Sequence, residues 1–106
     1  MRKGVNLKVT LAGKTKGDEK SAVDEILKAG QGVHPELKLK TKRVAKDKDG
    51  LTLSLYIEGE DEPAHDFAKS TRKAVREIIK EGLTRNPQHK LEVKDAAEHN
   101  PDEDDF

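Results

Sequence analysis

The chain contains no cysteine. Disulfide bonds and thiolate metal sites are therefore excluded, and the composition leaves the redox compartment undefined. Long apolar runs are also absent: no run of apolar residues approaches the ~18 residues of a membrane-spanning helix. The opening stretch MRKGVNLKVTLAGK lacks the apolar region of a secretory signal. We therefore expect a cytoplasmic protein that has no membrane-spanning segment.

Apolar and aromatic residues are scarce. The apolar set makes up 32% of the 106 residues, the aromatic set 3%, and charged residues 40%. A chain of this length forms one small domain, and this composition allows only a lean two-layer core. Tyr56 is the single tyrosine, and tryptophan is absent.

The formal net charge is zero, but the charges are unevenly distributed. Within residues 1–46, basic residues outnumber acidic ones by seven, whereas from Asp95 onward every charged side chain is acidic. This asymmetry indicates a basic body followed by an acidic tail.

Apolar residues alternate with polar ones in four segments, which predicts strands over residues 5–11, 36–46, 51–58 and 89–94. Apolar residues at spacings of three and four predict two helices. The first begins at Asp18 or Ser21 and stops at Gly30, and the second is capped by Asp61 and ended by Gly82. The order β-α-β-β-α-β is typical of the ferredoxin-like α+β arrangement. We predict a four-stranded antiparallel sheet with two helices on one face and the first and third strands at its centre.

Two irregularities interrupt the strand pattern. Arg43 and Val44 break the alternation, which predicts either a bulge or a strand end that is lifted off the core. Asp47 to Gly50 reads as a hairpin turn in which Asp-Gly supplies the residues with positive φ. We assign residues 1–94 to the ferredoxin-like domain and residues 95–106 to a disordered acidic tail.

The sheet face away from the helices is the strongest candidate for a binding site. Strand alternation places six lysines and one tyrosine there, namely Lys8, Lys38, Lys40, Lys42, Tyr56, Lys90 and Lys94. The layout resembles that of RNA-recognition modules, which bind single strands on an open four-stranded face and stack bases on aromatic rings. The resemblance implies that Tyr56 would stack a base; the aromatic pair of that family is absent. The alternative is an ordinary solvated sheet face.

The chain ends with acidic residues and a phenylalanine: Asp102, Glu103, Asp104, Asp105 and Phe106. This ending resembles the partner-docking tip of single-stranded-DNA-binding proteins, in which the ring fills a pocket of the partner and the acids meet a basic rim. The resemblance implies a docking peptide. The alternative is a tail that only increases solubility.

No pattern identifies a reaction, a metal or a cofactor. Gly13-Lys14-Thr15 looks like the end of a P-loop, but Lys8 stands where that motif needs glycine. A looser hypothesis remains, in which Lys14, Lys16 and Lys20 at a helix start hold a phosphate. His34, His65, His89 and His99 show no metal-ligand spacing.

The sequence therefore favours a small non-enzymatic binding module. We predict weak binding of single-stranded nucleic acid through the lysine-rich sheet face, with the acidic tail modulating it or docking a protein partner. The alternative is a protein-interaction or assembly module that does not bind nucleic acid. The expected partners include no membrane, and the expected state is a monomer or a homodimer.

Overall fold

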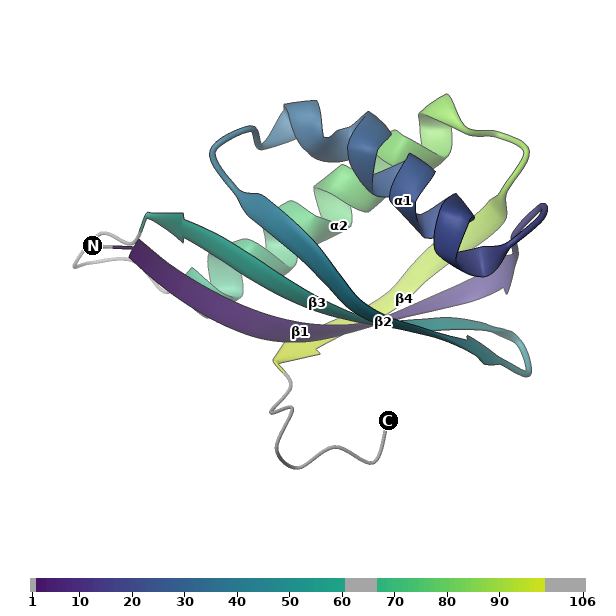
Figure 1. Cartoon of the computed structure of the whole chain (residues 1–106), viewed down its shortest axis with the longest axis horizontal. Coiled ribbons are helices and arrows are strands. Elements are labelled where there is room, and N and C mark those ends of the chain that lie inside the picture. The colour runs from purple at the N-terminus through teal and green to yellow at the C-terminus, as the bar shows by residue number, and fades with distance from the viewer. Residues whose placement is uncertain (1, 61–66, 99–106) are drawn as a thin grey trace.

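Figure 1 shows the computed structural model of the chain, which describes residues 2–60 and 67–98. Strands and helices follow one another in the predicted β-α-β-β-α-β order, with one 3-10 turn after the first helix. Their bounds are β1 Arg2–Lys14, α1 Glu19–Gly30, η1 Gln31–Val33, β2 Lys38–Asp47, β3 Gly50–Glu60, α2 Phe67–Arg85 and β4 Lys90–Glu98. The prediction of an α+β fold with a four-stranded antiparallel sheet and two helices is confirmed. The predicted cap of the second helix at Asp61 lies outside the described residues.

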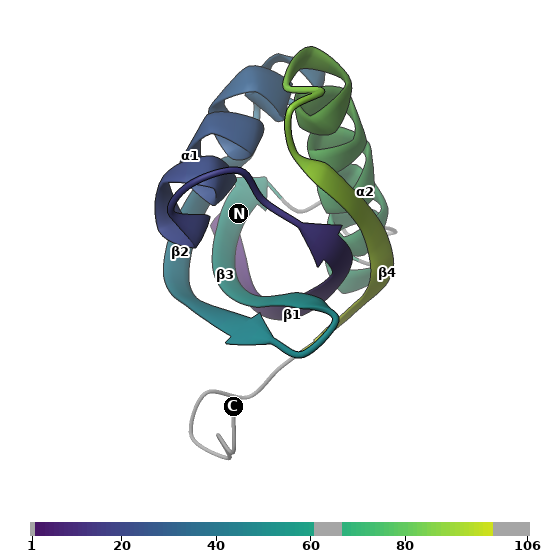
Figure 2. The same ribbon diagram turned by 90° about the vertical axis from the view of Figure 1, so that its right-hand side faces the viewer.

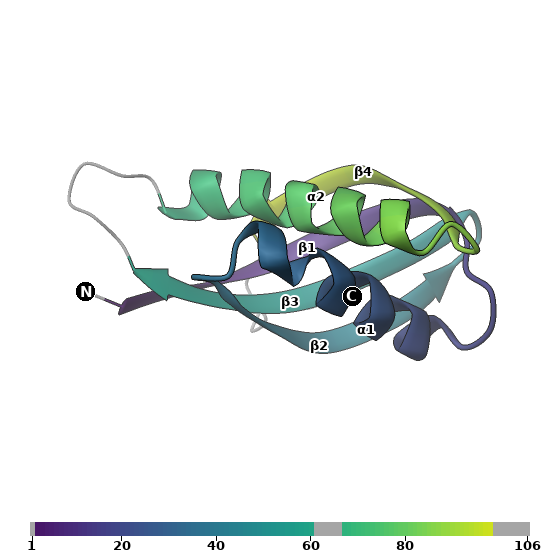
Figure 3. The same ribbon diagram turned by 90° about the horizontal axis from the view of Figure 1, so that it is seen from above.

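The sheet has the strand order β2-β3-β1-β4, and every neighbouring pair is antiparallel. The first and third strands therefore lie at the centre, as expected. Figure 2 shows that the sheet curves around the two helices, which lie side by side on its concave face. In Figure 3, seen from above, both helices run along the length of the strands. The opposite, convex face, which we call the outer face, carries no described helix.

The core forms where the period-two faces of the central strands meet the helices. Leu7, Val9 and Leu11 of β1 and the four aliphatics of β3, Leu51, Leu53, Leu55 and Ile57, are at most 3% exposed. Each helix contributes the apolar face that the spacing of its apolar residues predicts, including Ile26 and Ile78. Burying each large aliphatic stabilises the fold by about 1.5–3 kcal/mol.

The helices approach each other through a reciprocal pair of glycines. A Cβ on Gly30 of α1 would overlap the carbonyl oxygen of Ile78, and a Cβ on Gly82 of α2 would overlap that of Ile26. The prediction that Gly82 ends the second helix is wrong, because α2 continues to Arg85. Gly82 is instead a site of close backbone packing, and its φ is not positive.

Of the two predicted starts for the first helix, Asp18 and Ser21, the structure has Asp18 as the N-cap of α1. Its carboxylate accepts hydrogen bonds from the backbone N–H of Ser21 at 3.0 Å and from the Ser21 hydroxyl at 3.1 Å. Such a cap stabilises a helix by about 1 kcal/mol.

The predicted bulge in β2 is confirmed, and it changes which side chains face outward. Thr41 lies opposite Leu55 and Arg43 lies opposite Ser54, so Lys42 has no partner in β3. Arg43 therefore joins the outer face, and Val44, opposite Leu53, returns to the core side.

The hairpin between β2 and β3 differs from the prediction. Asp47 pairs with Gly50, and no described residue of this turn has a positive φ. Gly50 is required for another reason: a Cβ there would overlap the carbonyl oxygen of Leu11. The chain thus uses this glycine for close strand contact rather than for a left-handed turn.

Strand β4 ends at Glu98 rather than at Lys94, the last residue that we assigned to the domain. A second bulge explains the difference: Val93 pairs with Leu11 and Asp95 with Thr10, so Lys94 is the extra residue. After the bulge Ala96 points inward and is buried. Residues 99–106 of the predicted tail lie outside the described residues.

Candidate nucleic-acid interface

The outer face carries two adjacent rows of side chains across three strands. The registers place Lys40, Tyr56 and Asn6 in one row. The next row along the strands contains Arg43, Ser54 and Lys8. Neighbouring strands are ~4.8 Å apart, so the side chains of these rows lie within reach of one phosphodiester segment.

The ring of Tyr56 lies over the backbone of Gly4. A Cβ added to Gly4 would overlap the ring carbons and the hydroxyl of Tyr56. Gly4 lies on β1, diagonally opposite Tyr56 of β3. The direct partner of Tyr56 on β1 is Asn6. The ring is therefore laid along the sheet rather than standing upright from it, and its hydroxyl end occupies space that any other residue at position 4 would fill.

Lys42 approaches the same ring. Its Nζ lies 5.8 Å from the ring centroid, at the long end of the ~6 Å range for a cation–π contact. Lys42 is the bulged residue, and the registers place Lys40, Lys8 and Arg43 at neighbouring positions on the same face as Tyr56. We call Lys8, Lys40, Lys42, Arg43 and Tyr56 the Tyr56 cluster.

Arg43 is the member of this cluster that the sequence analysis missed. The interrupted alternation at residues 43 and 44 was the only signal, and it did not tell which residue was extra. The register answers this, since a bulge at Lys42 puts both Lys42 and Arg43 on the outer face.

The other predicted lysines either lie apart from this cluster or are paired across the strands with an acidic residue. Lys38 is in register with Glu58 on the outer face. Lys90 pairs with Lys14 at the far end of β1, about 26 Å along the strand from the row of Tyr56. Lys94 occupies the bulge in the edge strand β4. The structure thus brings Lys8, Lys40, Lys42 and Tyr56 together and separates Lys90 and Lys94 from them.

The loop that could hold a phosphate is already engaged in other contacts. The Asp18 carboxylate takes the place of an anion at the start of α1. The backbone N–H of Lys16 donates to Nδ1 of His89 at 3.1 Å. The structure therefore does not favour the phosphate hypothesis for Lys14, Lys16 and Lys20.

The two described histidines make structural contacts. His89 is buried, accepts the Lys16 N–H at Nδ1, and has Nε2 3.3 Å from Glu25 Oε2. His34 lies between Glu36 and Glu77, at 3.2 and 3.3 Å. In residues 2–60 and 67–98 no cluster of three or more metal-ligating side chains occurs. His65 and His99 lie outside these ranges.

One carboxylate in these contacts has a shifted pKa. A backbone hydrogen bond, assisted by the His34 side chain, lowers the pKa of Glu36. Glu36 is exposed beside the entrance to β2, so the shift reflects local hydrogen bonding rather than a buried reactive site.

The predicted docking residues Asp102, Glu103, Asp104, Asp105 and Phe106 lie outside the described residues. No helix in the described part of the chain is both long enough and apolar enough to cross a membrane.

Comparison with known proteins gives similarity of fold alone. No known protein family and no curated protein sequence matches the chain. Among solved structures, it resembles the Bacillus subtilis YXEP protein, a dinuclear metal binding peptidase of the M20 family, with 14% identity and a TM-score of 0.52. That alignment covers 95% of this chain and 29% of the peptidase chain. The de novo designed protein Foldit4 aligns over 92% of this chain and all of its own, with 12% identity and a TM-score of 0.45.

Proposed function

We propose that this protein is a small non-enzymatic module that binds single-stranded nucleic acid through the Tyr56 cluster. The observation that carries the proposal is the ring of Tyr56, laid over Gly4 on the outer face with Lys42 near it and basic residues at neighbouring positions of the same face. A flat aromatic ring accepts a stacked base of any sequence, and the surrounding cations bind the phosphates on either side. Binding by such a site is weak and independent of sequence.

Lys42 supports this role through its loose contact with the ring. At 5.8 Å from the centroid, the ammonium is held weakly, and an incoming base can replace it. The displaced lysine then neutralises a phosphate of the same strand. Binding would therefore exchange one weak contact for a stacking contact and an ion pair.

We propose the ferredoxin-like split β-α-β class for the fold. The central positions of β1 and β3 in the order β2-β3-β1-β4 support this assignment, as do two helices on one face. The class hosts many functions, so it does not by itself favour nucleic-acid binding.

The binding assay is a titration of fluorescent single-stranded oligonucleotides, followed by anisotropy at several salt concentrations. Tyr56→Ala should weaken binding by about 1–3 kcal/mol, the contribution of one stacked base. Lys40→Gln should weaken it and reduce the magnitude of the salt slope by about 0.7, the value for one phosphate of a single strand. Lys73→Gln, an exposed lysine of α2 on the opposite layer, is the matched control and should bind as the unaltered chain does.

The full chain must bind at low salt for the proposal to stand. Absence of binding at low salt, both with the acidic tail and with Asp102 to Asp105 replaced by their amides, would refute it. Equal losses for Lys40→Gln and Lys73→Gln would indicate nonspecific attraction to a basic body. If the amide variant alone binds more tightly, the tail competes with nucleic acid for cations.

Features of the sheet edges weigh against assembly as the main function. Both edge strands contain a bulge, at Lys42 in β2 and at Lys94 in β4, and bulges and lysines oppose edge-to-edge pairing. Within residues 2–60 and 67–98, Val33 is the one large apolar side chain that is strongly exposed. We therefore propose a monomer, which sedimentation at several protein concentrations can test.

A further inference from the structure

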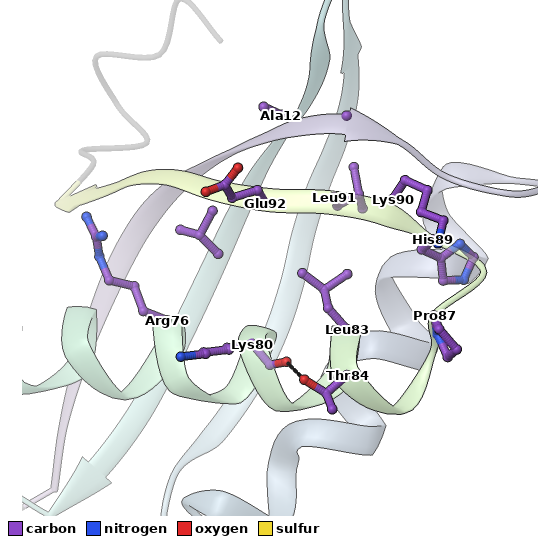
Figure 4. A pocket seen from close by; sticks show the side chains of 12 residues that line it. Ala12, Arg76, Lys80, Leu83, Thr84, Pro87, His89, Lys90, Leu91 and Glu92 are labelled. Atoms are coloured by element: carbon purple, nitrogen blue, oxygen red, sulfur yellow. Dashed lines mark hydrogen bonds between the residues drawn. The ribbon is translucent and has the colours of Figure 1, made fainter.

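A groove of about 850 Å³ runs between α2 and the edge strand β4 (Figure 4). It lies beside the helix layer, so it is separate from the Tyr56 cluster on the outer face. Its floor is apolar and consists of Leu83 from α2 with Leu91 and Val93 from β4, all half-buried. These three side chains pack against the hydrophobic core, and part of the surface of each is exposed in the groove.

Cationic side chains form the rim of the groove. Arg76 and Lys80 project from α2, and Lys90 projects from the start of β4 (Figure 4). In residues 2–60 and 67–98, Lys80 and Lys90 form no ion pair, and Arg76 has one long contact of 3.8 Å with exposed Asp95. Glu92 is the one carboxylate that lines the groove. An apolar floor with this rim suits a ligand that combines an apolar side chain with several negative charges.

We propose that the groove binds the chain's own C-terminal segment, with Phe106 on the apolar floor and the acidic side chains against the cationic rim. Asp102, Glu103, Asp104, Asp105 and the terminal carboxylate supply the charges, and Phe106 supplies the apolar group. The segment thus carries both properties that the groove requires, in adjacent residues.

The segment after β4 is long enough to reach back to the groove. β4 leads away from the groove and ends at Glu98, so the chain must reverse its direction, and Asn100-Pro101 is a turn sequence. Val93 precedes Glu98 by about 17 Å of strand. After the turn, residues 102–106 span at most about 17 Å when extended. At full extension Phe106 therefore reaches the level of Val93, and the preceding acids pass Arg76.

This inference does not depend on the nucleic-acid proposal, because it concerns another surface and its test contains no nucleic acid. It assigns to the acidic tail a binding site that is separate from the Tyr56 cluster. Because the contact is partly electrostatic, raising the salt concentration weakens it.

The test uses Phe106→Trp in the full chain, since the sequence otherwise contains no tryptophan. We expect emission at shorter wavelength than that of a free indole, and protection from acrylamide quenching. Adding Lys80→Glu and Lys90→Glu, two exposed positions, should abolish both effects. Lys40→Glu on the outer face is the matched control and should leave both effects intact.

Three outcomes would overturn the inference. A fully exposed indole in the otherwise unaltered chain shows that the groove is not occupied. Loss of protection on Lys40→Glu, but not on the groove variants, places the segment on the outer face. Protection that disappears on dilution shows that the groove binds the segment of a second copy. Backbone amide shifts of Leu91 and Val93, compared between the unaltered chain and Phe106→Ala, provide a second readout that does not require an added indole.

Discussion

The ring of Tyr56 lies over Gly4, and the two residues come from neighbouring central strands of the sheet. The absence of a side chain at position 4 leaves room for the ring to lie along the sheet. In any other residue at this position, the Cβ would force the ring to move. This relationship links a glycine near the start of the chain to the candidate binding site.

Gly4→Ala should therefore weaken oligonucleotide binding while leaving the fold intact. The displaced atoms belong to the end of a side chain on an exposed face, so the ring can move at little cost to stability. Alanine in a strand is itself favoured over glycine by roughly 0.5–1 kcal/mol. Anisotropy titrations measure the affinity, and urea unfolding measures the stability. Unchanged affinity for Gly4→Ala, together with reduced affinity for Tyr56→Ala, would show that the orientation of the ring is unimportant.

Most of the fold could be predicted from the sequence because its main signals are local. The alternation of Leu51 to Ile57 identifies a strand, and the spacing of apolar residues after Phe67 identifies a helix. The capping residues placed the start of α1 at Asp18 or Ser21, and Asp18 is the N-cap. Each of these patterns depends on neighbours within a few residues, and no knowledge of the rest of the chain is needed.

The remaining features depend on contacts between distant segments. Ala96 is buried because a bulge at Lys94 shifts the register against β1, and no local pattern marks that residue as the extra one. Arg43 joins the Tyr56 cluster for the same kind of reason. Gly4 and Gly82 resemble ordinary flexible residues in the sequence, whereas in the structure each makes room for a group far along the chain.

Gly82→Ala should destabilise the protein, although alanine is the better helix former. On an exposed helix the substitution would gain about 1 kcal/mol. Here the added Cβ overlaps the carbonyl oxygen of Ile26, a backbone atom that cannot rotate away, and overpacking of this kind costs about 1–3 kcal/mol. Urea unfolding measures the change in the free energy of unfolding.

Gly32→Ala is the matched control for this substitution. Gly32 is exposed in η1, its φ is not positive, and a Cβ there would meet no atom within 4 Å. Its stability should be unchanged or slightly increased. If both variants were equally stable, the helices would be able to separate without cost, and the close contact at Gly82 would not matter for folding.

Glu36 should contribute to the pH dependence of stability in acid. Its pKa is lowered in the folded state, chiefly by a backbone hydrogen bond, from an ordinary value of 4.5. A depressed pKa gives stabilisation that is present above the unfolded value and is lost as the pH falls through the folded value. The unaltered chain should therefore lose more stability than Glu36→Gln when the pH is lowered from 6 to about 3, because the carboxylate that accepts the hydrogen bond becomes progressively protonated.

Urea unfolding at these two pH values provides the test for Glu36. Glu92→Gln is the control, since Glu92 is exposed and makes no hydrogen bond or ion pair with a described residue. It should retain the full acid sensitivity. A Glu36→Gln variant that is as acid-sensitive as the unaltered chain would show that the hydrogen bond is not maintained in solution.

His89 should be fixed in one tautomer, and its loss should destabilise the loop before α1. A backbone N–H can only donate, so Nδ1 must accept the hydrogen bond from Lys16, and the ring proton lies on Nε2, toward Glu25. Long-range ¹H–¹⁵N correlation spectra distinguish the two tautomers directly. His89→Ala removes the acceptor of the Lys16 N–H, and a hydrogen bond of this kind contributes about 0.5–1.5 kcal/mol. His89→Asn, whose side-chain oxygen takes the place of Nδ1, should recover part of that loss. Observation of the Nδ1–H tautomer, or equal stability of the alanine and asparagine variants, would contradict this role for His89.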